Sequence, residues 1–138
     1  MAEKVNFELV SPERLLVSEH VDMVVVPGSE GDFGALPRHA PMMTALRPGV
    51  IDVYEDGKVR DRIFVAGGFA EVNETRLTVL AEEAVKVAEL SQDTISARIK
   101  AAEEAIEEAD GELARARAQS NLLVARAMQA ALDQRPVH

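Results

Sequence analysis

The stretch of sequence that decides the fold is VIDVYEDGKVRDRIFV, residues 50–65. Its two arms, 50–54 and 59–65, are rich in β-branched and apolar residues, as strands are. Between them lies Glu55-Asp56-Gly57-Lys58. Asp-Gly between two such runs is typical of a tight turn, because Gly accepts the positive φ that the turn demands. We therefore predict a β-hairpin here.

The segments before this hairpin are also typical of strands. Val5, Phe7 and Leu9 alternate with polar neighbours, which predicts a strand buried on one face. The run 21–26, closed by Pro27-Gly28, predicts a strand buried on both faces.

A second pair of strand-like runs follows the hairpin, at 69–72 and 76–80, joined across Asn73-Glu74. Gly67-Gly68 predicts a bulge or a close backbone approach within a strand. Short strands at roughly 8–12-residue spacing, with no helical segment between them, favour an antiparallel β-sandwich or a flattened barrel.

The composition changes sharply near residues 84–90. Seven of the eight glycines and five of the six prolines precede residue 89, whereas residues 89–138 hold twelve alanines. Turn-forming residues thus give way to helix-forming ones. We predict a β-sandwich domain over residues 1–86 and an α-helical hairpin domain over residues 87–138.

The second part is predicted to form two antiparallel helices. Ser91 is a suitable N-cap for the first helix, and Gly111 suits the left-handed position that follows its end. The first helix has one apolar stripe at helical spacing: Ile95, Ile99, Ala102, Ile106 and Ala109. The second has a stripe of small and apolar residues: Leu113, Ala116, Ser120, Leu123, Ala127 and Ala130.

The contact between these helices is predicted to be weak, because alanine side chains bury little apolar area. Acidic residues also crowd the end of the first helix: Glu103, Glu104, Glu107, Glu108 and Asp110. Their charge opposes the helix dipole. Two interpretations stay open: a solvated helix face, or a hairpin that detaches and binds a basic partner.

The charge and the motifs exclude several classes of function. The net charge of -9 disfavours nucleic acid and anionic lipid as partners, and the lack of cysteine excludes thiolate chemistry. No apolar run approaches the ~20 residues of a membrane span, so we expect a soluble chain. Glu30 and Asp32 between Gly28 and Gly34 argue against a phosphate-binding loop. The histidines lack metal-ligand spacing. The residues therefore favour a binding module without catalysis, metal or cofactor.

Three linked segments carry a resemblance to a known family. They are Gly28-Ser29-Glu30-Gly31-Asp32-Phe33-Gly34, Leu36-Pro37-Arg38-His39-Ala40-Pro41 and Leu46-Arg47-Pro48-Gly49-Val50. In this order and spacing they resemble the signature of the ε subunits of F-type ATP synthases, whose mitochondrial counterpart is called δ. Residues 67–72 and 77–82 are also similar to the family pattern.

The resemblance implies a fold and a role. It implies a β-sandwich followed by a two-helix hairpin, in a non-catalytic rotor subunit of the central stalk that links γ to the membrane c ring. Such a subunit helps to couple proton translocation to ATP synthesis, and in some bacterial members the hairpin also restrains ATP hydrolysis. The implied location is peripheral, on the cytoplasmic face of a bacterial inner membrane.

The resemblance also implies contact residues. Those that match its loops facing the polar loops of the c ring are Glu30, Asp32, Arg38 and His39. The residues of a mobile or γ-contacting hairpin, which also reaches α/β subunits in some members, are Ile95, Ile99, Ile106, Leu113, Leu123, Arg115 and Arg126.

The opening of the first helix departs from the family members that bind ATP there. Those carry Ile/Leu-Asp-x-x-Arg-Ala, whereas here Asp93 does not follow Leu90 and Arg98 lies five residues past Asp93. We therefore expect no ATP binding and a hairpin that is mostly folded down. The alternatives are an ATP-sensing regulator whose hairpin binds nucleotide, and an unrelated chaperone-like adaptor.

Overall fold

The computed structural model describes residues 3–134 and divides the chain into two compact units, Met1–Lys86 and Val87–His138. In the described part of the first unit there are eight strands: β1 (Val5–Val10), β2 (Leu15–Val21), β3 (Met23–Gly28), β4 (Gly31–Ala35), β5 (Met42–Ala45), β6 (Gly49–Glu55), β7 (Lys58–Val72) and β8 (Arg76–Lys86). The second unit holds a short 3-10 helix, η1 (Val87–Glu89), and two α-helices, α1 (Gln92–Glu108) and α2 (Glu112–Asp133).

The central hairpin is confirmed as β6 and β7. Glu55 pairs with Lys58, which leaves Asp56-Gly57 as a two-residue turn. Both turn residues have positive φ, 53° for Asp56 and 76° for Gly57. This is the backbone geometry that an Asp-Gly pair favours between twisted antiparallel strands.

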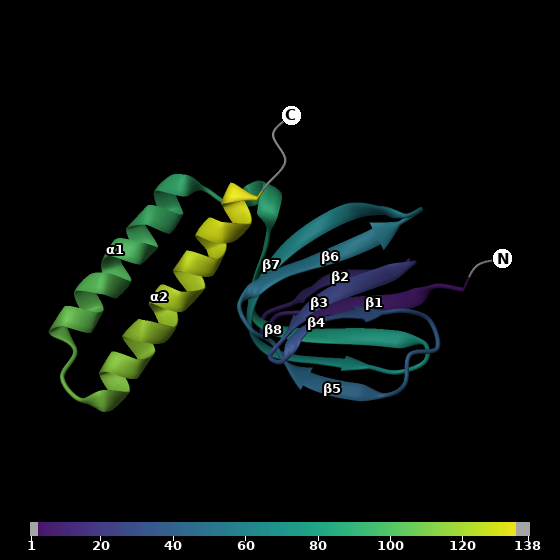
Figure 1. Ribbon diagram of the computed structural model, residues 1–138, viewed down its shortest axis with the longest axis horizontal. Helices are drawn as coiled ribbons and strands as arrows, with labels where there is room; N and C mark the ends of the chain where they lie inside the picture. The colour runs from purple at the N-terminus through teal and green to yellow at the C-terminus, as the bar shows by residue number, and fades with distance from the viewer. Residues whose placement is uncertain (1–2, 135–138) are drawn as a thin grey trace. The chain divides into compact units, whose positions relative to one another are not determined.

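The strands form a β-sandwich in which the β7–β8 ribbon belongs to both layers. The strands pair in the order β2-β1-β8-β7-β6-β3-β4, with β5 on β7. Residues 58–65 of β7 pair with β6, whereas residues 69–72 pair with β5. Because β8 accompanies β7 through both parts, the ribbon folds over at its middle, as Figure 1 shows.

Gly67-Gly68 forms the corner of this ribbon. The pairing keeps one register from Ala66↔Glu83 to Gly68↔Ala81, so the bulge alternative is wrong and the close-approach alternative holds. Gly68 has φ 96°, and a Cβ placed on it would overlap the Leu80 carbonyl oxygen. The two strands predicted at 59–65 and 69–72 are therefore one long strand, bent at a position that only glycine tolerates.

Three details of the predicted sandwich need correction. β1 and β8 are parallel, an arrangement that the long connection between them in the chain permits. The predicted strand 21–26 is interrupted at Asp22, and Val25 is only half-buried because it lies on the outer face of β3. Within residues 3–134 no strand joins β2 to β4, so the sheet is not closed and the flattened-barrel alternative is wrong.

The core lies between the two layers and is built from inward-facing apolar residues of both. Its fully buried members include Phe7 and Leu9 of β1, Ile51 of β6, Val65 of β7 and Leu77 of β8. Burying one such side chain stabilises the fold by about 1.5–3 kcal/mol. The alternation predicted for Val5, Phe7 and Leu9 is confirmed.

The predicted antiparallel two-helix hairpin is also confirmed (Figure 1). The Ser91 hydroxyl accepts a hydrogen bond from the Thr94 backbone N–H at 3.4 Å, which caps α1. Of the stripe predicted for α1, Ile95 and Ala102 are buried, and Ile99 and Ile106 are half-buried.

The apolar stripe predicted for α2 does not coincide with the buried face of the helix. Leu113 and Leu123 are 67% and 60% exposed. The buried residues of α2 are instead Ala118, Ala125, Met128 and Ala131. Alanines lie on several faces of this helix, so periodicity alone does not choose the face that packs.

We predict that Gly68→Ala destabilises the chain by at least about 3 kcal/mol, because it adds a steric clash with Leu80 to the strain of a positive φ. Gly57→Ala is the matched control. Its φ is also positive, but nothing lies within 4 Å of the new Cβ, so we expect a cost of only about 1 kcal/mol. Urea unfolding of both variants measures the difference, and equal losses would contradict the close approach at Gly68.

Candidate functional site

The first candidate surface is the turn between β3 and β4, which we call the acidic turn (residues 28–32). Gly28 pairs with Gly31, so Ser29 and Glu30 form its tip. The side chains of Glu30 and Asp32 are exposed. The structure thus brings these two predicted residues together on one tight turn at one end of the sandwich.

Arg47, on the link between β5 and β6, holds the acidic turn. One guanidinium nitrogen donates to the Gly28 carbonyl oxygen at 2.7 Å, and the other donates to the Asp32 carboxylate. The backbone N–H of Arg47 also donates to the Pro27 carbonyl at 3.0 Å. Arg47 was not among the predicted site residues, although it stands in the segment Leu46–Val50 that carried the resemblance.

Arg38 lies at the opposite end of the sandwich from the acidic turn. β4 begins at the turn and ends at Ala35, which pairs with Val24, so the chain has crossed the sandwich before it reaches Arg38. There the backbone N–H of Arg38 donates to the Glu74 carbonyl at 2.6 Å, and its guanidinium pairs with Glu3 at 2.8 Å. The structure therefore does not bring Arg38 together with Glu30 and Asp32, and a c-ring contact by Arg38 stays a prediction.

His39 packs along β4 rather than at its turn. Its ring centroid lies 6.3 Å from that of Phe33, with a tilt of 53° between the rings. Phe33 pairs with Val26 in the middle of the strand. The His39 ring therefore lies beside Phe33, the residue of β4 that follows Asp32.

The negative charge of the acidic turn affects the pKa of Asp52 in β6. Burial raises the pKa of the Asp52 carboxyl, Arg62 at 3.5 Å lowers it, and the negative charge of Asp32 raises it again. Arg47 and Arg62 therefore each balance one of these two carboxylates on the outer face of β4, β6 and β7.

The second candidate surface is an apolar patch formed by Met43, Phe69 and Leu80. These side chains are 64%, 54% and 52% exposed. Phe69 and Leu80 are direct partners across β7 and β8. The patch is hollowed, with cavities of about 390 Å³ and 150 Å³, and Glu82 and Glu71 lie at their borders.

The hairpin residues that were predicted as contacts fall into two groups. Ile95, Ile99 and Ile106 lie on the buried or half-buried side of α1. The others are exposed residues of α2: Leu113, Arg115, Leu123 and Arg126. Arg126 lies 3.8 Å from Glu103 of α1, an exposed ion pair that links the helices only weakly.

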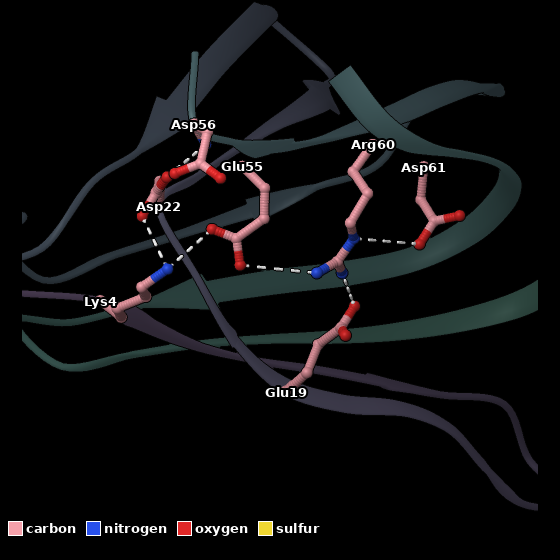
Figure 2. Close-up of polar contacts among 7 residues, drawn as sticks. All are labelled: Lys4, Glu19, Asp22, Glu55, Asp56, Arg60 and Asp61. Atoms are coloured by element: carbon pink, nitrogen blue, oxygen red, sulfur yellow. Dashed lines mark hydrogen bonds and ion pairs between the residues drawn. The ribbon is translucent and has the colours of Figure 1, made fainter. Parts of the chain in front are cut away.

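A charged network ties together the end of the sandwich that is opposite the acidic turn. Figure 2 shows Lys4 between Glu55, at 2.7 Å, and Asp22, at 3.1 Å. Asp22 also accepts the Asp56 backbone N–H at 2.7 Å. Arg60 completes the network by contacting Glu55, Glu19 and Asp61. Two basic side chains thus bridge four carboxylates, and the network links Lys4 and Asp22 to residues of β2, β6 and β7.

The Asp56 N–H and the Lys4 ammonium lower the pKa of the Asp22 carboxyl. Glu55 and Asp22 in turn raise the pKa of Lys4.

Within residues 3–134, no group of three or more acidic or histidine side chains is placed to hold a metal ion. None of the described helices has the length and apolarity to cross a membrane.

Comparison with known proteins decides the family. Residues 4–87 match the family model for the β-sandwich domain of the ATP synthase delta/epsilon chain. The chain is 62% identical to the ATP synthase epsilon chain of Paramagnetospirillum magneticum over 132 residues, which is 96% of this chain and 99% of that one. The chain belongs to the ATP synthase epsilon chain family. The epsilon chain of Rhodospirillum rubrum is 58% identical over 131 residues, 95% of this chain and 98% of that one.

Solved structures agree with this membership in the epsilon chain family. A chain in the cryo-EM structure of the Euglena gracilis mitochondrial ATP synthase, described as OSCP/F1/c-ring, superposes with a TM-score of 0.79 and 26% identity, covering 94% of this chain and 81% of that one. A chain in the central stalk/c-ring structure from Tetrahymena thermophila has a TM-score of 0.71 at 13% identity, over 94% and 97% of the chains, and shows the shared fold.

Membership in the epsilon chain family confirms the prediction of a non-catalytic central-stalk subunit of ATP synthase. Its association with the membrane is through the complex. The acidic turn and the apolar patch are thus surfaces of a subunit that acts by contact, so their partners rather than their chemistry define the function.

We predict that Asp22→Asn destabilises the chain at neutral pH but not in acid. A carboxyl whose pKa is lowered by folding stabilises the folded state above its ordinary pKa of 3.8 and loses this effect as the pH falls further. The thermal midpoint of the variant should lie below wild type at pH 7, and the gap should shrink as the pH falls below 3.8. A constant gap across this range would contradict the role given to the charge of Asp22.

Proposed function

We propose that this central-stalk subunit links the γ subunit to the c ring at the cytoplasmic face of a bacterial inner membrane, and so helps to couple proton translocation to ATP synthesis. The near full-length identity to bacterial epsilon chains supports this proposal. The observation that carries it is the presence of two unlike surfaces on one rigid sandwich. One is a small acidic turn, and the other is an apolar patch.

The acidic turn suits the polar loops of a membrane ring. Its carboxylates stand on a turn of fixed backbone and remain exposed. Exposed charges of this kind set the register and the rate of encounter more than the affinity. We assign the c-ring contact to the acidic turn that carries Glu30 and Asp32, and we propose that Arg38 and His39 hold the segment between β4 and β5.

The apolar patch suits the γ subunit. Three large apolar side chains that line one hollow and are exposed by half or more mark a protein contact rather than a solvated surface. The hollows beside Phe69 would take apolar side chains of γ, while Glu71 and Glu82 favour basic residues around them. Leu113 and Leu123 of α2 are exposed in the same way, and we propose that they form a second contact, with γ or with the α/β subunits.

The nucleotide-sensing alternative finds less support. Arg98, the basic residue nearest to the family's ATP motif, has its guanidinium 3.4 Å from the Met128 sulfur of α2. It thus packs within the hairpin. The adaptor alternative is disfavoured by identity that extends over nearly the whole length of the epsilon chains.

We predict that a photo-crosslinker on Ser29→Cys, at the tip of the acidic turn, labels the c subunit in the assembled enzyme. The chain has no native cysteine, so the label is specific. Glu74→Cys, in the β7–β8 turn at the other end of the sandwich, is the matched control and should label c at least about tenfold less. Labelling would be measured after reconstitution into enzyme depleted of this chain. Equal labelling from both positions would contradict the assignment.

We predict that Phe69→Glu or Leu80→Glu weakens binding to γ by about 30-fold or more, as loss of a central apolar contact does. Both residues are half-exposed, so the variants should keep the thermal midpoint of wild type. Leu36→Glu, equally exposed but outside the patch, is the control. Titration calorimetry with isolated γ measures the affinities, and an unchanged affinity in both patch variants would remove γ from this surface.

A further inference from the structure

We propose that Arg47 is the positioning residue of the c-ring contact, and that it leaves Glu30 as the one carboxylate that the acidic turn offers to a basic group of the ring. This inference rests on the function proposed above. Arg47 itself would not touch the ring. It acts by holding the backbone and one of the two carboxylates of the turn.

The geometry shows that the turn is held from outside in addition to its own pairing between β3 and β4. The Arg47 guanidinium bridges the two ends of the turn, because it donates to the Gly28 carbonyl at 2.7 Å and to the Asp32 carboxylate. The Arg47 backbone N–H donates to Pro27. Ser29 N–H donates to the Ala45 carbonyl at 2.8 Å. These contacts come from Ala45 at the end of β5 and from Arg47 in the link that follows it.

The charges show which carboxylate is left for a partner. Arg47 neutralises Asp32, and within residues 3–134 the Glu30 side chain has neither an ion pair nor a hydrogen bond. A planar guanidinium that binds a carboxylate and a carbonyl together fixes direction as well as charge. The turn therefore presents a single negative charge at a defined place.

A purely stabilising role fits Arg47 less well. Its side chain is 43% exposed and that of Asp32 is 60% exposed. An ion pair this exposed adds little to the stability of a fold. Removing the Arg47 side chain should therefore leave the sandwich folded while the acidic turn becomes mobile.

The first test follows amide hydrogen exchange in the isolated chain. In Arg47→Ala the Ser29 amide should exchange about tenfold faster, since its bond to Ala45 opens locally, while the thermal midpoint stays close to wild type. Arg76→Ala, which removes another exposed arginine paired at 4.0 Å with Glu8, should leave this exchange unchanged. Unchanged exchange in Arg47→Ala would overturn the inference.

The second test uses the assembled enzyme with the crosslinker on Ser29→Cys. Arg47→Ala should lower the yield of labelled c subunit about fivefold or more, whereas Arg76→Ala, which removes an exposed arginine outside the turn, should leave it within about twofold of wild type. An undiminished yield in Arg47→Ala, or an equal loss in Arg76→Ala, would overturn the positioning role of Arg47. If the c subunit is not labelled even with Arg47 intact, the c-ring assignment itself is rejected. The hydrogen-exchange test would then still show whether Arg47 holds the backbone of the acidic turn.

Discussion

The close approach of Gly68 to the backbone of Leu80 is the constraint on which the rest of the structure depends. It lets the β7–β8 ribbon fold over, so that one pair of strands contributes to both layers of the sandwich. At the same corner, the Leu46 backbone N–H donates a hydrogen bond to the Gly68 carbonyl oxygen at 3.0 Å. This bond anchors the link that carries Arg47. Arg47 in turn holds the acidic turn, so a backbone constraint in the fold also bears on a proposed contact surface.

The corner also decides where the apolar patch lies. Ala70 and Val79 face the core, so their neighbours Phe69 and Leu80 must face outward. A half-exposed Phe beside a half-exposed Leu lowers the solubility of the isolated chain. A partner that covers both side chains would explain why they are exposed here. The acidic turn lies at the same end of the sandwich as the corner. One rigid element thus sets the spacing between the two proposed contacts.

The features that the sequence predicted are those that depend on neighbouring residues. Asp56-Gly57 defines its turn by local backbone preference alone, and the alternation of Val5, Phe7 and Leu9 reports one buried face directly. Residues 28–50 carried the family resemblance because their turn-forming glycines and prolines occur in a specific order.

The features that could not be predicted from the sequence depend on contacts between residues far apart in the chain. Arg47 binds residues 19 and 15 positions earlier in the chain, and no local pattern reports such a pairing. Arg38 lies only six residues after Asp32 in the sequence, but a full strand away from the acidic turn in the structure. The buried face of α2 was missed because its alanines suit more than one face.

The central claim is that this chain is a stoichiometric part of a rotor that joins γ to the c ring. Its most direct test is to tag the chain, extract membranes of its source cell in mild detergent, and quantify the proteins that co-purify. The account predicts α, β, γ and c subunits, with one tagged chain for each γ. Recovery of the chain alone, or with a scatter of unrelated proteins, would contradict it.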